Sequence, residues 1–198
     1  MGTTMHIHRK FRMKGGEIIP FTGWLVSNRH HIYELFAELG YKVGAEIGVR
    51  AGNNARVMFQ KNPKMKLYCV DTWAPFEGGV PSQHKQNMYF YNAKKVLRGY
   101  DVVFLKKTSM EALSDIQDGS LDFVYIDAMH DFDNVMIDII GWSKKVKSGG
   151  IVSGHDYAND CGIGVIPAVN GYVAGHTITE WYITKEKNDN RSFFWVKP

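Results

Sequence analysis

Two carboxylates and two histidines follow two predicted strands in the second half of the chain. Asp127 and His130 come after one apolar run, and His155 and Asp156 come after another. In an open α/β sheet the carboxyl ends of adjacent strands share one crevice, so these side chains are expected to meet. Two carboxylates in one cleft repel each other unless a proton or a cation separates them. Their oxygens suit Mg²⁺, Mn²⁺ or Ca²⁺, and such an ion would bind a substrate's hydroxyl oxygens and lower their pKa.

A histidine beside such an ion adds a proton acceptor to this cluster. The pKa of imidazole lies near neutrality, so a neutral ring can take the proton of a hydroxyl group. Structural roles are the alternatives at each position. His130 can cap the following helix, and Asp127 can be an ordinary loop acid. His155 and Asp156 can form a buried, hydrogen-bonded pair at the end of a strand.

A second candidate site is the turn in the segment A-E-I-G-V-R-A-G. Glu46 precedes Gly48 by two positions and Gly52 by six, and Asp71 ends a short apolar run 25 positions after Glu46 (71 − 46 = 25). Glycines let the backbone approach a ligand, and a carboxylate about 20 residues further on accepts hydrogen bonds from ribose hydroxyls. Arg50 stands where a dinucleotide fingerprint needs its second glycine, so the predicted ligand is a nucleoside without a pyrophosphate. The alternative is a glycine turn that only closes a strand–helix unit.

Strands and helices alternate along most of the chain, and they must position these residues. This alternation favours a parallel sheet with right-handed crossovers, and the last two strands predict an antiparallel hairpin. Apolar spacing and turn residues predict strands over 43–48, 66–70, 102–106, 121–126, 151–154, 177–184 and 191–196. They predict helices over 27–39, 54–59, 84–98, 110–116, 134–146 and 165–173.

Two segments are expected to lack regular structure. Residues 1–20 contain Gly15, Gly16 and Pro20, and we predict an irregular N-terminal segment followed by one domain over 21–198. Residues 74–83 carry two prolines and two glycines just after the ribose-binding acid. We therefore predict a lid-like loop over about 74–92 that selects the second substrate.

Length and composition limit the classes of protein to consider. The 198 residues suit one domain, and 44% hydrophobic and 13% aromatic residues suit a packed core. Much of the net charge of +4 lies near the ends, and the lack of an accompanying basic helix or aromatic stacking platform disfavours nucleic acid as a partner. Cys69 and Cys161 form no disulfide framework, and no window is apolar enough to span a membrane. We expect a cytoplasmic protein that does not bind membranes, and a homo-oligomer remains open.

These motifs together resemble a known family. E-x-G-x-x-x-G followed by a strand-end acid resembles class I S-adenosylmethionine-dependent methyltransferases. I-D-x-x-H and then G-G-I-V-x-x-H-D-Y resemble the small metal-dependent O-methyltransferases, which include the catechol O-methyltransferase type and bacterial sugar and antibiotic O-methyltransferases. The resemblance covers about 43–160. It implies a Rossmann-like α/β fold, doubly wound and mostly parallel, with a C-terminal antiparallel hairpin.

The resemblance also implies roles for individual residues. His130, with Asp127, takes the catalytic position, and Asp127, Asp156 and His155 take the metal positions. Tyr157 stands where the catechol enzymes have an asparagine ligand. The residues at positions that bind S-adenosylmethionine are Glu46, Gly48, Gly52, Asn54, Asp71, Thr72, Trp73, Ser109, Met110 and Asp127.

The predicted activity is S-adenosylmethionine-dependent O-methylation of a small hydroxylated molecule: a sugar, a natural product or an aromatic. A divalent cation, Mg²⁺ with Mn²⁺ or Ca²⁺ as alternatives, is expected to assist. One alternative is a metal-dependent hydroxylase type that shares this motif pattern. Another is a non-catalytic nucleoside-binding protein, which the intact Asp127, His130 and Asp156 disfavour. Arg50 disfavours a nicotinamide-dependent oxidoreductase.

Overall fold

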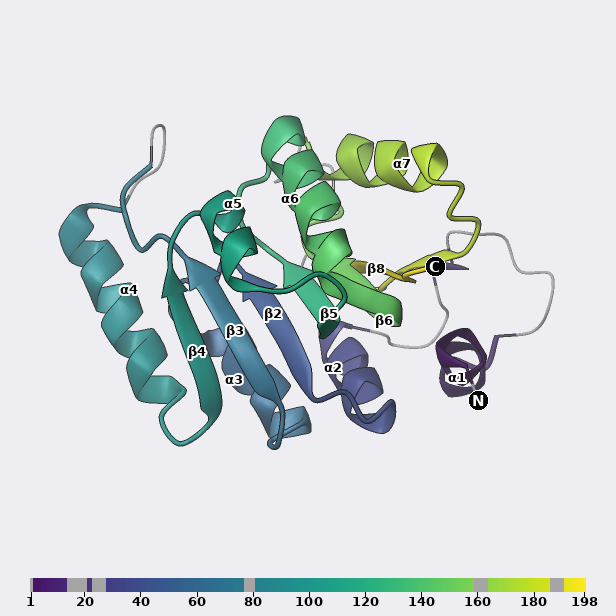
Figure 1. Cartoon of the computed structure of the whole chain (residues 1–198), viewed down its shortest axis with the longest axis horizontal. Coiled ribbons are helices and arrows are strands. Elements are labelled where there is room, and N and C mark those ends of the chain that lie inside the picture. Colours follow the sequence, from purple (N-terminus) through teal and green to yellow (C-terminus); the bar gives the residue numbers. More distant parts are fainter. Residues whose placement is uncertain (1, 14–20, 23–27, 77–80, 159–163, 186–190) are drawn as a thin grey trace.

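A single sheet with helices on both faces forms the protein in the computed structural model (Figure 1). The structure describes residues 2–13, 21–22, 28–76, 81–158, 164–185 and 191–198. Its strands are β1 (Phe21–Thr22), β2 (Val43–Ile47), β3 (Lys66–Asp71), β4 (Asp101–Lys106), β5 (Leu121–Ile126), β6 (Val146–Gly154), β7 (Trp181–Ile183) and β8 (Phe193–Val196). Its helices are α1 (Thr3–Lys10), α2 (Arg29–Glu38), α3 (Asn53–Lys61), α4 (Gln83–Val96), α5 (Ser109–Ala112), α6 (Phe132–Lys145) and α7 (Val165–Gly175), with a 3₁₀ turn, η1 (Leu113–Asp115), after α5.

The strand order confirms the predicted fold class. The strands lie in the order β1-β7-β8-β6-β5-β2-β3-β4. Among the described strands, β8 alone runs against its neighbours, and it pairs antiparallel with both β6 and β7. The hairpin predicted for the C-terminal part is therefore present, with Trp181 opposite Trp195. After β2, the strands β3 and β4 are added on one side of it, and β5 and β6 are added on the other side. The ends of β2 and β5 therefore lie at the centre of the carboxyl edge.

Strand β5 shows why helices must cover both faces of the sheet. All six of its residues are buried, and its side chains alternate between the faces. Phe123 and Tyr125 join the apolar cluster beneath α2, α3 and α4, whereas Val124 and Ile126 join the cluster beneath α6 and α7. A near-continuous apolar strand is what a parallel sheet covered on both faces requires.

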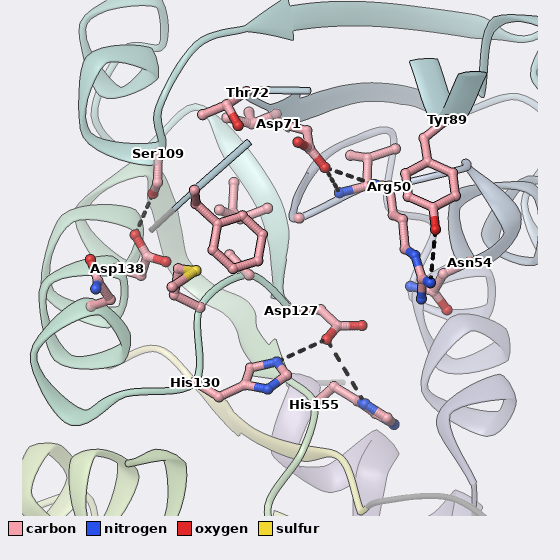
Figure 2. A pocket seen from close by; sticks show the side chains of 18 of the residues that line it. Arg50, Asn54, Asp71, Thr72, Tyr89, Ser109, Asp127, His130, Asp138 and His155 are labelled. Carbon is pink, nitrogen blue, oxygen red and sulfur yellow. Dashed lines mark hydrogen bonds and ion pairs between the residues drawn. The ribbon is translucent and has the colours of Figure 1, made fainter. Parts of the chain in front are cut away.

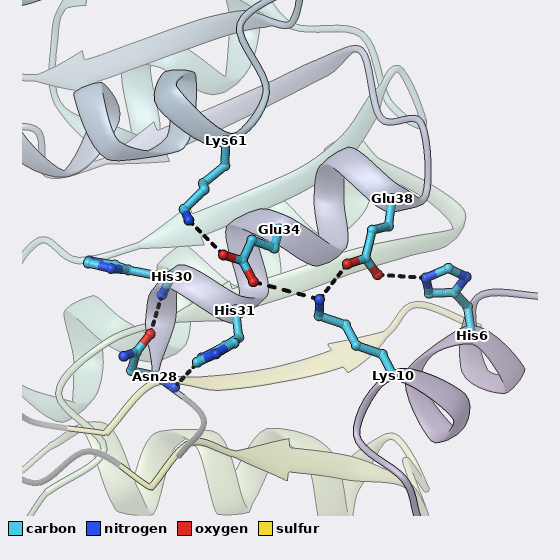
Figure 3. A network of polar contacts seen from close by, with 8 residues as sticks. All are labelled: His6, Lys10, Asn28, His30, His31, Glu34, Glu38 and Lys61. Carbon is cyan, nitrogen blue, oxygen red and sulfur yellow. Dashed lines mark hydrogen bonds and ion pairs between the residues drawn. The ribbon is translucent and has the colours of Figure 1, made fainter. Parts of the chain in front are cut away.

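The N-terminal segment differs from the prediction, because α1 is a regular helix rather than an irregular segment. The glycines and the proline that indicated irregularity follow α1 in the sequence and cannot interrupt it. Ile7 is fully buried in the cluster beneath α2. His6 and Lys10 also contact Glu38 of α2, at 2.9 and 2.5 Å (Figure 3). Exposed ion pairs contribute little, so the burial of Ile7 is what makes the helix stable.

The lid-like loop predicted over 74–92 is also wrong in its second half. Helix α4 begins at Gln83, and the hydroxyl of Ser82 caps it by accepting a hydrogen bond from the Lys85 amide. The irregular part thus ends at residue 82, and 77–80 lie outside the described residues, as does Cys161. Among the helices that are described, none has both the length and the apolar character needed to cross a membrane.

Candidate active site

A cavity of about 1180 Å³ lies at the carboxyl ends of the central strands. The turns after β2, β3, β4, β5 and β6 all contribute to its lining, together with residues of α2, α4 and α6. Figure 2 shows its walls: Asp127, His130 and His155 on one side, Asp71 and Thr72 opposite, and the pairs Ser109–Asp138 and Arg50–Tyr89 at the two ends. The crevice predicted at this edge of the sheet is therefore present.

The two glycines of the first motif are required for different reasons. Gly48 has a φ of +89°, and a Cβ atom there would lie 2.0 Å from the carbonyl oxygen of Asp127. The end of β2 therefore passes directly against the end of β5. Gly52 has a φ of +77°, and a Cβ atom there would lie 2.9 Å from the Cα of Ala93 in α4. Gly48 lines the cavity, whereas Gly52 does not and instead lets α4 pack against the start of α3.

Asp71 holds the turn between β2 and α3 in place. Its Oδ2 accepts hydrogen bonds from the amides of Val49 and Arg50, at 3.0 and 2.7 Å. Its Oδ1 accepts a hydrogen bond from the Trp73 amide at 2.8 Å. The carboxylate lines the cavity, and Oδ1, which accepts one hydrogen bond, keeps acceptor capacity for a ribose hydroxyl. Thr72 lines the cavity next to it.

Trp73, which the resemblance put among the residues that bind S-adenosylmethionine, is a core residue and does not line the cavity. Its side chain is fully buried, and its indole Nε1 donates to the carbonyl oxygen of Arg50 at 2.8 Å. Its ring packs on Phe90 of α4 at 4.4 Å and edge-on against Phe104 of β4 at 6.0 Å. A tryptophan at the end of a strand can face the ligand or the core, and here the position of α4 puts it in the core.

Glu46 lies behind the cavity wall in a buried polar network. Asn54 Nδ2 donates to Glu46 Oε1 at 2.8 Å, and the hydroxyl of Tyr33 donates to Asn54 Oδ1 at 2.5 Å. Glu46 Oε2 is buried and has no hydrogen-bond partner among the described residues. Burial is the main cause that raises the pKa of Glu46 to about 8. Asn54 lines the cavity, but its carbonyl oxygen and one amide proton are engaged inside the protein. Tyr33, on α2, had no sequence signal apart from its helical spacing.

The acids and histidines that follow β5 and β6 come together as predicted. His130 Nε2 lies 2.9 Å from Asp156 Oδ2 and 3.8 Å from Asp127 Oδ1. Hydrogen bonding to Asp127, and then to Asp156, raises the pKa of His130 to about 10. Asp156 has a φ of +57°, in the left-handed region that a residue with a side chain rarely adopts. Such strain is typical of functional positions.

His155 lies beside the same two aspartates, in the buried pair with Asp156 that was the alternative reading of the sequence. Its Nδ1 lies 3.2 Å from Asp156 Oδ1, and its Nε2 lies 3.3 Å from a guanidinium nitrogen of Arg29. Because a guanidinium only donates, this contact assigns Nε2 as the acceptor and puts the imidazole proton on Nδ1. Among the described residues, the one group of three whose ligand atoms converge within 4.8 Å is Asp127, His130 and Asp156. His155 is not in this group.

At one end of the cavity, Ser109 and Met110 lie beside α6. The Ser109 hydroxyl donates to Asp138 Oδ1, and the indole of Trp142 donates to Ser109 Oγ at 2.7 Å. Met110 is 46% exposed and lines the cavity. Asp138 was missed from the sequence, where its only signal was an acid on the apolar side of a helix.

At the other end, Arg50 and Tyr89 form a cationic wall that was also not predicted. Arg50 has a φ of +52°, and its guanidinium donates to the Tyr89 hydroxyl at 3.2 Å. The same guanidinium lies 5.0 Å from the centre of the Tyr89 ring, and Lys85 lies 5.9 Å from it. Both Arg50 and Lys85 line the cavity. This end therefore favours a negatively charged part of a ligand.

Comparison with known proteins identifies the family of the chain. A family model described as a methyltransferase domain matches residues 45–157, more than half of the chain. An uncharacterized protein of Sinorhizobium fredii, y4gI, is 29% identical over 141 residues, which are 69% of this chain and 14% of that protein. The chain therefore spans a small part of the curated relative that it matches.

Several solved structures share the fold. The O-methyltransferase from Bacillus cereus in complex with SAH has a TM-score of 0.60 at 12% identity, over 98% of this chain and 88% of that one. The precorrin-6y C5,15-methyltransferase of Geobacter metallireducens has a TM-score of 0.60 at 12% identity, over 89% and 93%. The spermidine synthase of Thermotoga maritima has a TM-score of 0.59 at 14% identity, over 86% and 60%. At these identities the likeness concerns the fold.

The chain belongs to the methyltransferase-domain family. Its sheet order, its glycine turn after β2 and the acid at the end of β3 are those of a class I methyltransferase. The domain at 45–157 is an S-adenosylmethionine-dependent methyltransferase domain.

Proposed function

We propose that this protein transfers a methyl group from S-adenosylmethionine to a hydroxyl oxygen of a small molecule, with the help of a divalent cation. The observation that carries the proposal is the convergence of Asp127, His130 and Asp156 within 4.8 Å in the cavity that Asp71 also lines. Ligands bound at 2.0–2.6 Å to one ion are at most about 5 Å apart, so this spacing fits one ion. Two carboxylates and an imidazole suit Mn²⁺ and Mg²⁺, with the remaining positions left for water and substrate.

In this proposal His130, rather than His155, is the third protein ligand. A bound cation would lower the pKa of the acceptor hydroxyl. Asp127 and Asp156 supply the negative charge that holds the ion, and His155 orients Asp156 from the side facing Arg29. The earlier assignment of His130 as the catalytic base remains a prediction, and one substitution separates the two roles. His130→Gln should weaken Mn²⁺ binding if His130 is a ligand, and should leave it unchanged if His130 is only a base.

The cavity also supports a small acceptor. S-adenosylmethionine would place its ribose at Asp71 and its sulfonium toward the acid–histidine cluster, since the turn after β2 lies between them. An acceptor hydroxyl at the cluster would then face the methyl group, and the protein would contribute by positioning and by excluding water. The cavity lies within a folded domain and suits a sugar, a natural product or an aromatic rather than a macromolecule. These partners, and a cytoplasmic location, are proposals.

Calorimetry tests the proposal directly. S-adenosylmethionine and S-adenosylhomocysteine should bind with micromolar affinity, and at 100 times the Kd they should stabilise the fold by about 2.7 kcal/mol. Asp71→Ala should weaken both sharply, and NADH should not bind. Mn²⁺ should bind the wild type but not Asp127→Asn or Asp156→Asn. If NADH binds and S-adenosylmethionine does not, the assignment of the cofactor is wrong. If Mn²⁺ binds equally to the wild type and to both variants, the proposed metal site is wrong.

A further inference from the structure

Asp138 is a buried acid that the metal cluster and the ribose-binding turn leave without a role. It lies on α6 between Val135 and Trp142, on the face of the helix that packs against the sheet, and it is only 4% exposed. It nevertheless lines the cavity. Burial raises the pKa of its carboxyl group to about 6, so the group remains largely ionised at neutral pH. A charged group at such a position requires hydrogen-bond donors.

One oxygen of this carboxylate is already satisfied by the protein. Asp138 Oδ1 accepts the hydroxyl proton of Ser109, and the lone pair of Ser109 Oγ accepts the indole proton of Trp142 at 2.7 Å. Ser109 has a single proton, so it has none left to donate to a ligand. This chain of two hydrogen bonds fixes the orientation of the carboxylate, because the indole is itself fully buried.

The other oxygen is presented to the cavity. Asp138 Oδ2 accepts no hydrogen bond from the described residues. It is nevertheless not one of their buried polar atoms that lack a partner, so it is in contact with solvent. Since Asp138 lines the cavity, Oδ2 is accessible from it (Figure 2). A ligand bound at this end of the cavity should therefore donate a hydrogen bond to Asp138 Oδ2.

The structure of S-adenosylmethionine indicates which of its parts lies at the Asp138 end of the cavity. The sulfonium and the base are attached to opposite sides of the ribose, so the base must point away from the acid–histidine cluster. Of the two remaining ends, the one at Arg50 is cationic and suits the amino-acid part of the cofactor. The end at Asp138 offers the exposed apolar side chains of Met110 and Ile137, which suit a flat aromatic base.

We propose that Asp138 is the residue that selects adenine, with Oδ2 accepting a hydrogen bond from the exocyclic amine and Ser109 holding the carboxylate in place. The inference rests on the proposed function, because it takes S-adenosylmethionine as the cofactor. Hypoxanthine carries a carbonyl oxygen where adenine carries the amine, so two acceptors would face each other. Asp138 thus excludes cofactors with that base.

The test compares S-adenosylhomocysteine with S-inosylhomocysteine by calorimetry, without added metal. The wild type should prefer the adenosine compound by at least about tenfold, as loss of one charge-assisted hydrogen bond implies. In Asp138→Asn the amide oxygen can still accept from Ser109, and the amide nitrogen then faces the cavity as a donor. The preference should fall below about threefold or invert.

Asp133→Asn is the matched control, since it removes the same charge from an exposed position on the same helix that does not line the cavity. It should leave the preference unchanged. A folded Asp138→Asn protein that keeps the tenfold preference would overturn the proposal. If that variant does not fold, Ser109→Ala, which frees the carboxylate from its tether, should reduce the preference at least about threefold, and an unchanged value would overturn it. A wild type that binds neither compound would instead overturn the proposed function.

Discussion

Replacing Glu46 with glutamine should change how the stability of the protein depends on pH. Glu46 is 1% exposed, and burial, the largest cause, raises its pKa from the ordinary 4.5 to about 8. The folded protein therefore keeps a proton on Glu46 over a range of pH in which the unfolded chain has lost it. By linkage, the free energy of unfolding must fall as the pH rises through this range. Glutamine can accept the same hydrogen bond from Asn54 but carries no titrating proton.

The size of the effect follows from the width of that range. The interval from 4.5 to about 8 spans about 3.5 pH units, and each corresponds to about 1.36 kcal/mol. The wild type should thus lose up to about 5 kcal/mol of unfolding free energy, relative to Glu46→Gln, between pH 4.5 and 8. The effect is fully developed above pH 8 and absent below pH 4.5. This is a large part of the 5–15 kcal/mol that stabilises an ordinary domain.

Urea unfolding of the ligand-free protein at half-unit steps between pH 5 and 8.5 measures this difference. The control is Glu111→Gln, because Glu111 is exposed and hydrogen bonds from Thr108 lower its pKa, so its proton is already lost above pH 5. That variant should shift the stability by the same amount at every pH. If wild type and Glu46→Gln gave parallel curves, Glu46 would be ionised in the folded state, and a donor to Oε2 would have to be present.

The remaining predictions concern packing and the metal. Trp73→Ala should lower the free energy of unfolding by about 3–5 kcal/mol in urea titrations, because it empties a core site; a loss below about 1 kcal/mol would contradict the buried position. Gly48→Ala should cost at least about 2 kcal/mol, because its Cβ would meet the backbone of Asp127, whereas Gly149→Ala, with a similar φ and open space, should cost only about 1–2 kcal/mol. Equal losses for the two glycine variants would refute the close approach. Asp156→Asn should abolish methyl transfer and Mn²⁺ binding, EDTA should do the same to the wild type, and full activity in EDTA would exclude the metal.

Local sequence patterns predicted the frame of this protein. The strand expected over 121–126 is β5 with the same bounds. Its short and nearly continuous apolar run indicates a strand that is buried on both faces, and all six residues are buried. The turn after β2 was predicted because Gly48 and Gly52 allow a turn between a strand and a helix that can approach a ligand, whereas the contact of Gly48 with the backbone of Asp127 was found only in the structure. The meeting of Asp127, His130, His155 and Asp156 was predicted because strand ends in a parallel sheet meet at one edge, whereas the structure selected His130 for the convergent group.

Tertiary packing decided what each side chain in this frame does. Trp73 is a core residue because α4 packs over it, and Gly52 is needed because the same helix approaches the start of α3. Asp138 reaches the cavity because α6 packs beside α5, where Ser109 can hold it. Among the described residues, His130 converges with both aspartates as a third ligand atom, whereas His155 pairs with Asp156 and is contacted on its far side by Arg29 of α2. The sequence by itself determined the succession of most strands and helices along the chain and the edge at which the polar residues gather, because periodicity and glycine are local properties. Which of those residues face the ligand depends on helices distant in the chain, and only the folded structure places them.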